Sequence, residues 1–193
     1  MPFFFILVST LWLVVGMLYA NSRKPGYSHW RDTISELGEI GTPLTRPVSY
    51  GLFLPVGLLL WLAAWLTEDK TTTGLATCVG AGYVIAALFP CDVGSPASGS
   101  GRQQLHNLGG GIEYLGGAYW LSQLSPGPTI AGYSLFSLAA GVVVTGAVLL
   151  SVPGIPIRGL TQRIVEALLF GSLLLLGLVN QQPLSGLSDY LFF

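Results

Sequence analysis

Charged residues are scarce in this chain. Only 9% of its 193 residues are Asp, Glu, Lys or Arg, whereas an ordinary soluble domain has about 25%. So few charges cannot coat a surface that faces water. The net charge is −1 and the sequence contains no cluster of Lys and Arg, so nothing in it favours a nucleic-acid partner.

Cysteine and histidine are nearly absent as well. The two cysteines, Cys78 and Cys91, form no CxxC pair, and the two histidines are His29 and His106. The sequence has no HExxH, no GxSxG and no histidine triad. Any metal site would therefore use mixed nitrogen and oxygen ligands, because thiolates are scarce.

Long apolar runs dominate what remains. The chain is 51% hydrophobic with a mean hydropathy of +0.65, and a helix of roughly 20 apolar residues crosses a bilayer. Six runs approach this length: Pro2–Ala20, Pro47–Leu66, Gly74–Pro90, Leu105–Leu124, Pro128–Val152 and Ile164–Asn180. The sequence predicts an all-α polytopic protein, with six transmembrane helices in one bundle and a single domain over residues 1–193.

The basic residues predict the orientation of these spans. Seven of the eight Lys and Arg residues belong to the first, third and fifth connections, and only Lys70 belongs to an even-numbered one. The positive-inside rule then places the odd-numbered connections in the cytoplasm and both termini outside, in the cell (plasma) membrane. The first run lacks a basic region before it, so it is interpreted as a retained span and not as a signal peptide.

The first connection contains a distinctive segment, His29–Gly38. Read as a helix, it has a polar face and an apolar face: His29, Asp32 and Glu36 on one, Trp30, Ile34 and Leu37 on the other. The segment predicts a short amphipathic helix in the membrane interface, between the first two spans. A connector whose charges simply face water is the alternative.

The fourth run carries an acid, Glu113, well inside the predicted bilayer. Such residues usually face a cavity or a partner, although a protonated carboxyl group can also serve packing. His106 lies seven residues before it on the same helix face, and glycines surround both. Glu166, in the sixth run, stands three residues after Arg163, so a local ion pair there is the simplest interpretation.

Most of these polar residues converge on one membrane face, which favours a shared polar pocket. The residues proposed for catalysis are Asp32, Ser35, Glu36, Asp92 and His106. Those proposed for substrate binding are Arg31, Glu113, Arg163 and Glu166. The ligands proposed for a divalent metal are His29, Asp92 and His106.

The chain resembles a known family at these same positions. The segments Arg31–Gly38 (RDTISELG), Phe89–Asp92 (FPCD), Leu105–His106 and Gln162–Arg163 are similar, in this order, to the bacterial and archaeal family called domain of unknown function 998. The resemblance implies a six-span membrane protein and supports the choice of candidate residues. It implies no reaction.

Three kinds of function remain open on this evidence. One is an enzyme or binding protein that acts on a membrane lipid, with an Arg holding a phosphate head group. Another is a small-solute or proton-coupled transporter that uses Glu113 and His106. The last is a non-catalytic assembly factor, and protein partners, a homo-oligomer among them, are left open.

Overall fold

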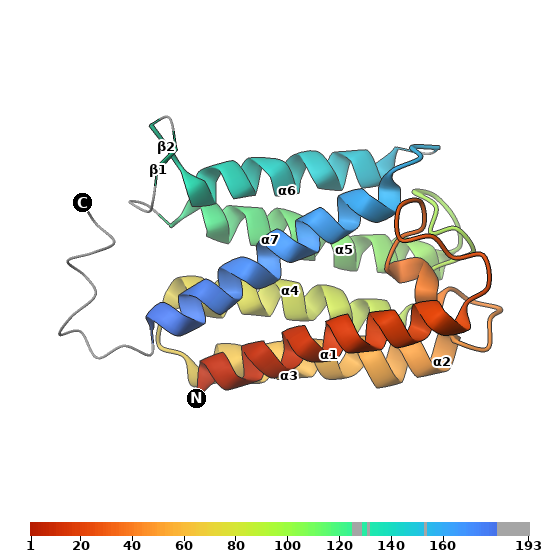
Figure 1. The fold of residues 1–193 in the computed structure, drawn as a ribbon, viewed down its shortest axis with the longest axis horizontal. Helices are drawn as coiled ribbons and strands as arrows, with labels where there is room; N and C mark the ends of the chain where they lie inside the picture. Colours follow the sequence, from red (N-terminus) through yellow and green to blue (C-terminus); the bar gives the residue numbers. More distant parts are fainter. Residues whose placement is uncertain (125–128, 131, 153, 181–193) are drawn as a thin grey trace.

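The computed structural model describes residues 1–124, 129–130, 132–152 and 154–180. Its main elements are helices (Figure 1): α1 (Pro2–Arg23), α2 (Thr45–Val48), α3 (Leu54–Leu66), α4 (Lys70–Leu88), α5 (Gly101–Ser122), α6 (Leu135–Ser151) and α7 (Arg158–Val179). A π-helical turn, η2 (Ser49–Phe53), joins α2 to α3, and a 3-10 helix, η1 (Ser35–Gly38), lies in the first connection. A two-residue hairpin, β1 (Thr129–Ile130) with β2 (Tyr133–Ser134), precedes α6.

Within the described residues, four helices are long and apolar enough to cross a membrane: Pro2–Arg23, Pro47–Leu66, Lys70–Leu88 and Arg158–Val179. The apolar helix α6 is shorter, at 17 residues. These findings confirm the all-helical prediction and identify an integral membrane protein. The predicted fifth run begins at Pro128, which lies outside the described residues.

The helices pack side by side in a closed bundle (Figure 1). Contacts follow the order α1, α3, α4, α5, α6, α7, and α7 also contacts α1 and α4. The contact between α3 and α4 requires glycine, because a Cβ on Gly57 would lie 2.7 Å from the Gly80 carbonyl oxygen. Small residues allow this close approach of two membrane helices.

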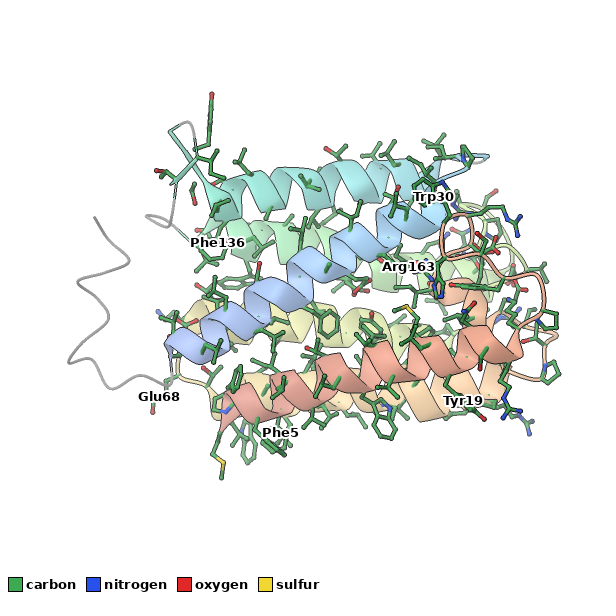
Figure 2. The ribbon with its side chains drawn as sticks, viewed as in Figure 1. Phe5, Tyr19, Trp30, Glu68, Phe136 and Arg163 are labelled. Carbon is green, nitrogen blue, oxygen red and sulfur yellow. The ribbon has the colours of Figure 1, made fainter. Side chains whose placement is uncertain are left out.

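The odd-numbered connections gather at one end of the bundle, on the right in Figure 1, where nitrogen and oxygen atoms concentrate in Figure 2. Backbone hydrogen bonds join them: Gly159 donates to Arg31, Leu160 to Trp30 and Ile40 to Cys91. We call this the polar end. Most of the interior is apolar, with Leu60, Leu75 and Leu169 fully buried.

The first connection does not form the amphipathic helix that its sequence suggests. Only Ser35–Gly38 is helical, and residues 29–31 form a turn followed by a bend at Asp32. The reason is that α7 takes the backbone groups that a helix would use. Arg163 donates to the carbonyls of His29 and Asp32, and Gln162 accepts the Ile34 N–H.

Candidate functional site

Asp32 holds a turn of the first connection together. Its carboxylate accepts from the Ser28 N–H at 2.8 Å and from Arg31 Nε at 2.7 Å. Partial burial alone would raise the pKa of Asp32, but the hydrogen bonds from Arg31 and Ser28 outweigh it and hold that pKa below its usual value. The two carboxylate oxygens are thus occupied by the protein itself.

Asp92 organises the loop between α4 and α5 in the same way. Its carboxylate accepts from the Ser100 N–H at 2.8 Å, the Ser100 hydroxyl at 2.9 Å and Arg102 Nη2 at 2.7 Å. These hydrogen bonds, the one from the Ser100 amide foremost, hold the pKa of Asp92 below its usual value. Asp92 therefore acts here as a structural carboxylate.

Glu36 caps its own short helix. One of its carboxylate oxygens accepts from both the Thr33 N–H (3.0 Å) and the Thr33 hydroxyl (2.9 Å), while the Glu36 N–H donates back to Thr33 Oγ1. This reciprocal pattern is a capping box.

Arg163 fastens the first connection to α7. Its Nη1 donates to the carbonyls of His29 and Asp32 at 2.9 and 3.1 Å, and its Nη2 donates to Tyr27 Oη at 2.7 Å. Burial raises the pKa of Tyr27 to about 12 against the opposing effect of Arg163. Burial and the Arg163 charge together lower the pKa of His29.

Glu166 does not form the ion pair with Arg163 that their spacing suggests. Its two carboxylate oxygens accept instead from the hydroxyls of Tyr83 and Tyr114, each at 3.0 Å. Gln162 Nε2 donates to Tyr114 Oη at 2.9 Å. A buried network of side chains therefore joins α4, α5 and α7 in the interior of the bundle.

Sequence reasoning missed the partners in this network. Tyr83 and Tyr114 lie in apolar runs, where an aromatic residue ordinarily serves packing, and Gln162 stands out only in a segment that resembles the family. The signal available was the hydroxyl, because a buried Tyr needs a hydrogen-bond partner.

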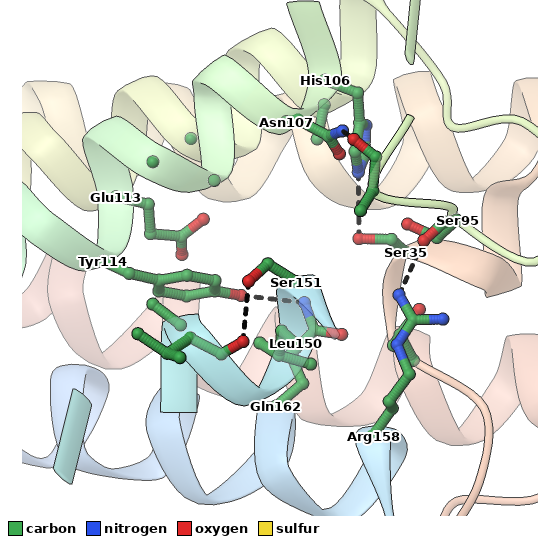
Figure 3. A pocket seen from close by; sticks show the side chains of 18 of the residues that line it. Ser35, Ser95, His106, Asn107, Glu113, Tyr114, Leu150, Ser151, Arg158 and Gln162 are labelled. Atoms are coloured by element: carbon green, nitrogen blue, oxygen red, sulfur yellow. Dashed lines mark hydrogen bonds between the residues drawn. The ribbon is translucent and has the colours of Figure 1, made fainter. Parts of the chain in front are cut away.

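A cavity of about 380 Å³ lies next to the polar end and is lined by residues of α4, α5, α6 and α7 (Figure 3). Its polar lining comes from Thr33, Ser35, Ser95, His106, Asn107, Glu113, Tyr114, Ser151, Arg158 and Gln162. Its apolar lining includes Leu115 on α5 and Val148 on α6, which are 57% and 58% exposed. We call it the α5–α6 cavity. It combines polar groups with apolar side chains on the exposed exterior of the bundle.

Glu113 is the acidic residue among those that line this cavity. The residue is 6% exposed, it packs against Gly82 of α4, and its Oε1 has no hydrogen-bond partner within the described part of the chain. Figure 3 shows its carboxyl group directed into the cavity, together with the hydroxyl of Tyr114.

His106 and Ser35 lie next to each other in the wall of the cavity (Figure 3). His106 Nδ1 lies 2.9 Å from the Phe89 carbonyl oxygen, and its Nε2 lies 3.1 Å from Ser35 Oγ. A carbonyl oxygen can only accept, so in the neutral imidazole Nδ1 carries the hydrogen and Nε2 accepts from the Ser35 hydroxyl. His106 is buried, whereas Ser35 is half-buried.

Arg158, at the start of α7, supplies the cation of the cavity. Its Nη1 and Nη2 donate to the carbonyls of Gly94 and Ser95 at 3.0 and 2.6 Å, and its buried Nε has no partner among the described residues. In the sequence, Arg158 counts only among the basic residues of the fifth connection. Its place in the cavity depends on how the third connection folds.

Three of the predicted site residues therefore line the cavity together: Ser35, His106 and Glu113. Glu166 belongs to the buried network described above. The others lie at the polar end, and none of these residues is part of the lining: His29, Arg31, Asp32, Glu36, Asp92 and Arg163. Among the residues that the structure describes, no three His, Cys, Asp or Glu side chains are placed to hold a metal ion. The structure thus does not bring His29, Asp92 and His106 together as a metal site.

Comparisons with known proteins agree with the segments that first indicated a family. No curated protein and no solved structure matches the chain. A family model described as "Protein of unknown function (DUF998)" matches residues 7–179, which cover most of the sequence, from within α1 to the end of α7. The chain belongs to the DUF998 family.

Proposed function

We propose that this protein spans the cell membrane six times and binds the polar head group of a membrane lipid in the α5–α6 cavity. Helices α5 and α6 complete the six spans. With 22 and 17 residues, they are about 33 and 25 Å long at 1.5 Å per residue, close to the hydrocarbon thickness of a bilayer. The basic connections then face the cytoplasm.

The orientation has a direct test. In a background without Cys78 and Cys91, Lys70→Cys and Val93→Cys place one thiol at each end of the bundle, and both positions are exposed. A membrane-impermeant maleimide added to intact cells should label Lys70→Cys and leave Val93→Cys unlabelled until the cells are opened. The reverse labelling pattern would mean that the protein has the opposite orientation in the membrane. It would not bear on the proposed cavity.

The observation that carries the lipid proposal is the composition of the cavity wall. The lining combines polar side chains from the first connection, α5 and α7 with the exposed apolar side chains of Leu115 and Val148. In a bilayer those two residues face acyl chains, since exposed apolar side chains of a membrane bundle contact lipid. A molecule with a polar head and an apolar tail matches both kinds of wall.

The polar groups indicate what the head group carries. The Oε1 of Glu113 and the Nε of Arg158 are buried without partners in the described residues, and unpaired buried polar groups cost free energy. A head group with both a hydrogen-bond donor and an anionic oxygen would satisfy Glu113 and Arg158 respectively. Phosphoethanolamine and phosphoglycerol head groups meet both requirements.

The proposal can be tested by filling the cavity. Gly111 lines it, and a Cβ added there meets no atom within 4 Å, so Gly111→Leu should occupy the ligand's space without disturbing the helices. Gly141→Leu on α6 is the matched control, because a Cβ there also meets open space while Gly141 is not part of the lining.

The measurement is native mass spectrometry of the purified protein with phosphatidylethanolamine or phosphatidylglycerol in mixed micelles. We expect Gly111→Leu to weaken retention of at least one of these lipids about tenfold or more, which is about 1.4 kcal/mol. Gly141→Leu should match the wild type. Equal retention by all three proteins would contradict the proposal.

A further inference from the structure

We propose that Ser35 is a nucleophile, that His106 is its general base, and that the lipid in the α5–α6 cavity is an ester whose acyl group Ser35 accepts. This inference rests on the proposed function, because the cavity must admit the lipid. It adds a reaction to a binding site. The observation behind it is the hydrogen bond between His106 Nε2 and Ser35 Oγ.

The pair has the geometry of an activated serine. The distance of 3.1 Å between Nε2 and Oγ lies within the hydrogen-bond range expected for a nucleophile and its base. The Phe89 carbonyl, 2.9 Å from Nδ1, orients the ring and fixes the tautomer in which Nε2 is free to take a proton. In serine hydrolases a third group fills this same orienting role.

The structure holds Ser35 in place from both sides along the chain. The N–H of the preceding residue, Ile34, donates to Gln162 on α7, and the carbonyl oxygen of Ser35 itself accepts from the thiol of Cys91 at 3.3 Å. His106 is fixed by its burial in α5. The nucleophile and the base therefore meet without any change in the fold.

The cavity offers a contrast in another serine. Ser151 also lines it, but its hydroxyl donates to the Val148 carbonyl of its own helix at 2.7 Å. Such a bond is common for serine in membrane helices and leaves no base beside the oxygen. Within the lining, the hydroxyl that faces an imidazole is that of Ser35.

The acyl transfer balances with water or an alcohol as the second reactant. Ser35 Oγ attacks the ester carbonyl carbon, and its proton moves to His106 Nε2 as the carbonyl oxygen becomes an oxyanion. The carbon–oxygen bond to the lipid alcohol then breaks, and the alcohol leaves with the proton from Nε2. Water, or a second alcohol, attacks the acyl-serine by the same route and regenerates Ser35.

Arg158 is the group placed to stabilise negative charge in this sequence of steps. Its guanidinium lines the same cavity, and its Nε–H has no partner within the described residues. Figure 3 shows Arg158 on the Ser35 side of the cavity, away from Glu113. A cationic donor near the developing oxyanion lowers the barrier in acyl transfer.

The test uses an alkyl fluorophosphonate, a reagent that phosphonylates activated serines. The purified full-length protein in lipid nanodiscs is treated with the reagent, and the modified residue is mapped by mass spectrometry. We expect a single adduct at Ser35 in the wild-type protein. Site mapping in the wild type does not depend on whether any variant folds.

Three variants complete the test. Ser35→Ala should remove the adduct, and Ser151→Ala should keep it. His106→Gln should slow labelling about 100-fold or more, as expected when a general base is lost. The melting temperature of each variant shows whether lost labelling reflects lost folding.

Two outcomes distinguish this inference from the proposed function. If Gly111→Leu abolishes lipid retention but the wild type gives no adduct at Ser35, the serine and histidine only tie the first connection to α5, and the inference is overturned. If labelling of Ser35 depends on His106 but Gly111→Leu does not change lipid retention, then Ser35 is an activated nucleophile and the proposed lipid site is wrong.

Discussion

The Nε2 atom of His106 lies 3.1 Å from the Oγ atom of Ser35, although 71 residues separate the two in the chain. The contact makes the first connection part of the cavity wall and not a surface loop. The same connection is held on its other side by α7, through Gln162 and Arg163. Predictions about stability and predictions about the cavity therefore involve the same segment.

Gln162 links three parts of the bundle, and its removal should be costly. It accepts from the Ile34 N–H at 2.7 Å and donates to Tyr114 Oη at 2.9 Å, both inside the protein. Gln162→Ala leaves the buried Ile34 N–H without a partner and removes one of the two hydrogen bonds of Tyr114 Oη, so we expect the free energy of unfolding to fall by about 1–3 kcal/mol. Denaturant unfolding in micelles measures this. Gln104→Ala, at an exposed position of α5, is the control, and equal stability of the two variants would disprove the role given to Gln162.

Gly159 sets how closely the first connection approaches α7. A Cβ there would lie 2.7 Å from the His29 carbonyl oxygen and closer still to that of Asp32. Gly159→Ala should therefore push the connection outward and lower the melting temperature by several degrees, for a cost of about 1–3 kcal/mol.

The control for this prediction is on the same helix. A Cβ on Gly171 meets nothing within 4 Å, so Gly171→Ala should be neutral or should stabilise α7 slightly through better helix propensity. Similar melting temperatures for the Gly159 and Gly171 variants would show that the approach is less tight than described.

The lowered pKa of Asp92 predicts how the stability of the folded protein depends on pH. The pKa of Asp92 in the folded protein is held below the usual 3.8. Between the lower folded pKa and the usual value, the unfolded chain therefore binds the proton more readily than the folded protein does. The stabilising contribution of Asp92 is then fully present above about pH 4 and is lost as the pH falls through the lower folded pKa. The melting temperature of the wild type should exceed that of Asp92→Asn near neutral pH, and the gap should close in acid.

A surface acid serves as the comparison for Asp92. Glu68 is exposed in the turn before α4, so Glu68→Gln should follow the wild-type melting curve at each pH. A constant difference between wild type and Asp92→Asn from neutral to acid pH would mean that the charge of Asp92 does not matter.

The sequence predicts the helical architecture well because apolar runs such as Pro2–Ala20 need only local information to become helices. It fails at His29–Gly38, where the pattern is helical but the backbone groups are taken by Gln162 and Arg163, more than 120 positions later. Tertiary hydrogen bonds override local pattern there.

The candidate site was predictable where rare residues carry it. His106 and Glu113 stand out because histidines and buried acids are few in this chain, and Ser35 stands out because it lies among the charged residues of the first connection. Arg158 and Tyr114 did not stand out: an arginine in a connection is ordinary, and a tyrosine in a membrane helix is ordinary packing. Charge also misled, since Asp32 and Asp92 are conspicuous in sequence yet serve to fold the polar end.

The most direct test of the central claim, that a lipid head group occupies the α5–α6 cavity, is photo-crosslinking with a phospholipid that carries a diazirine near the start of its acyl chain. Adducts are mapped by mass spectrometry and compared with Leu11 and Val15 of α1, which are 54% and 64% exposed and contact bulk lipid. The account predicts adducts concentrated at Leu115 and Val148 and suppressed by Gly111→Leu. Equal labelling of α1 and the cavity wall, unchanged by Gly111→Leu, would contradict it.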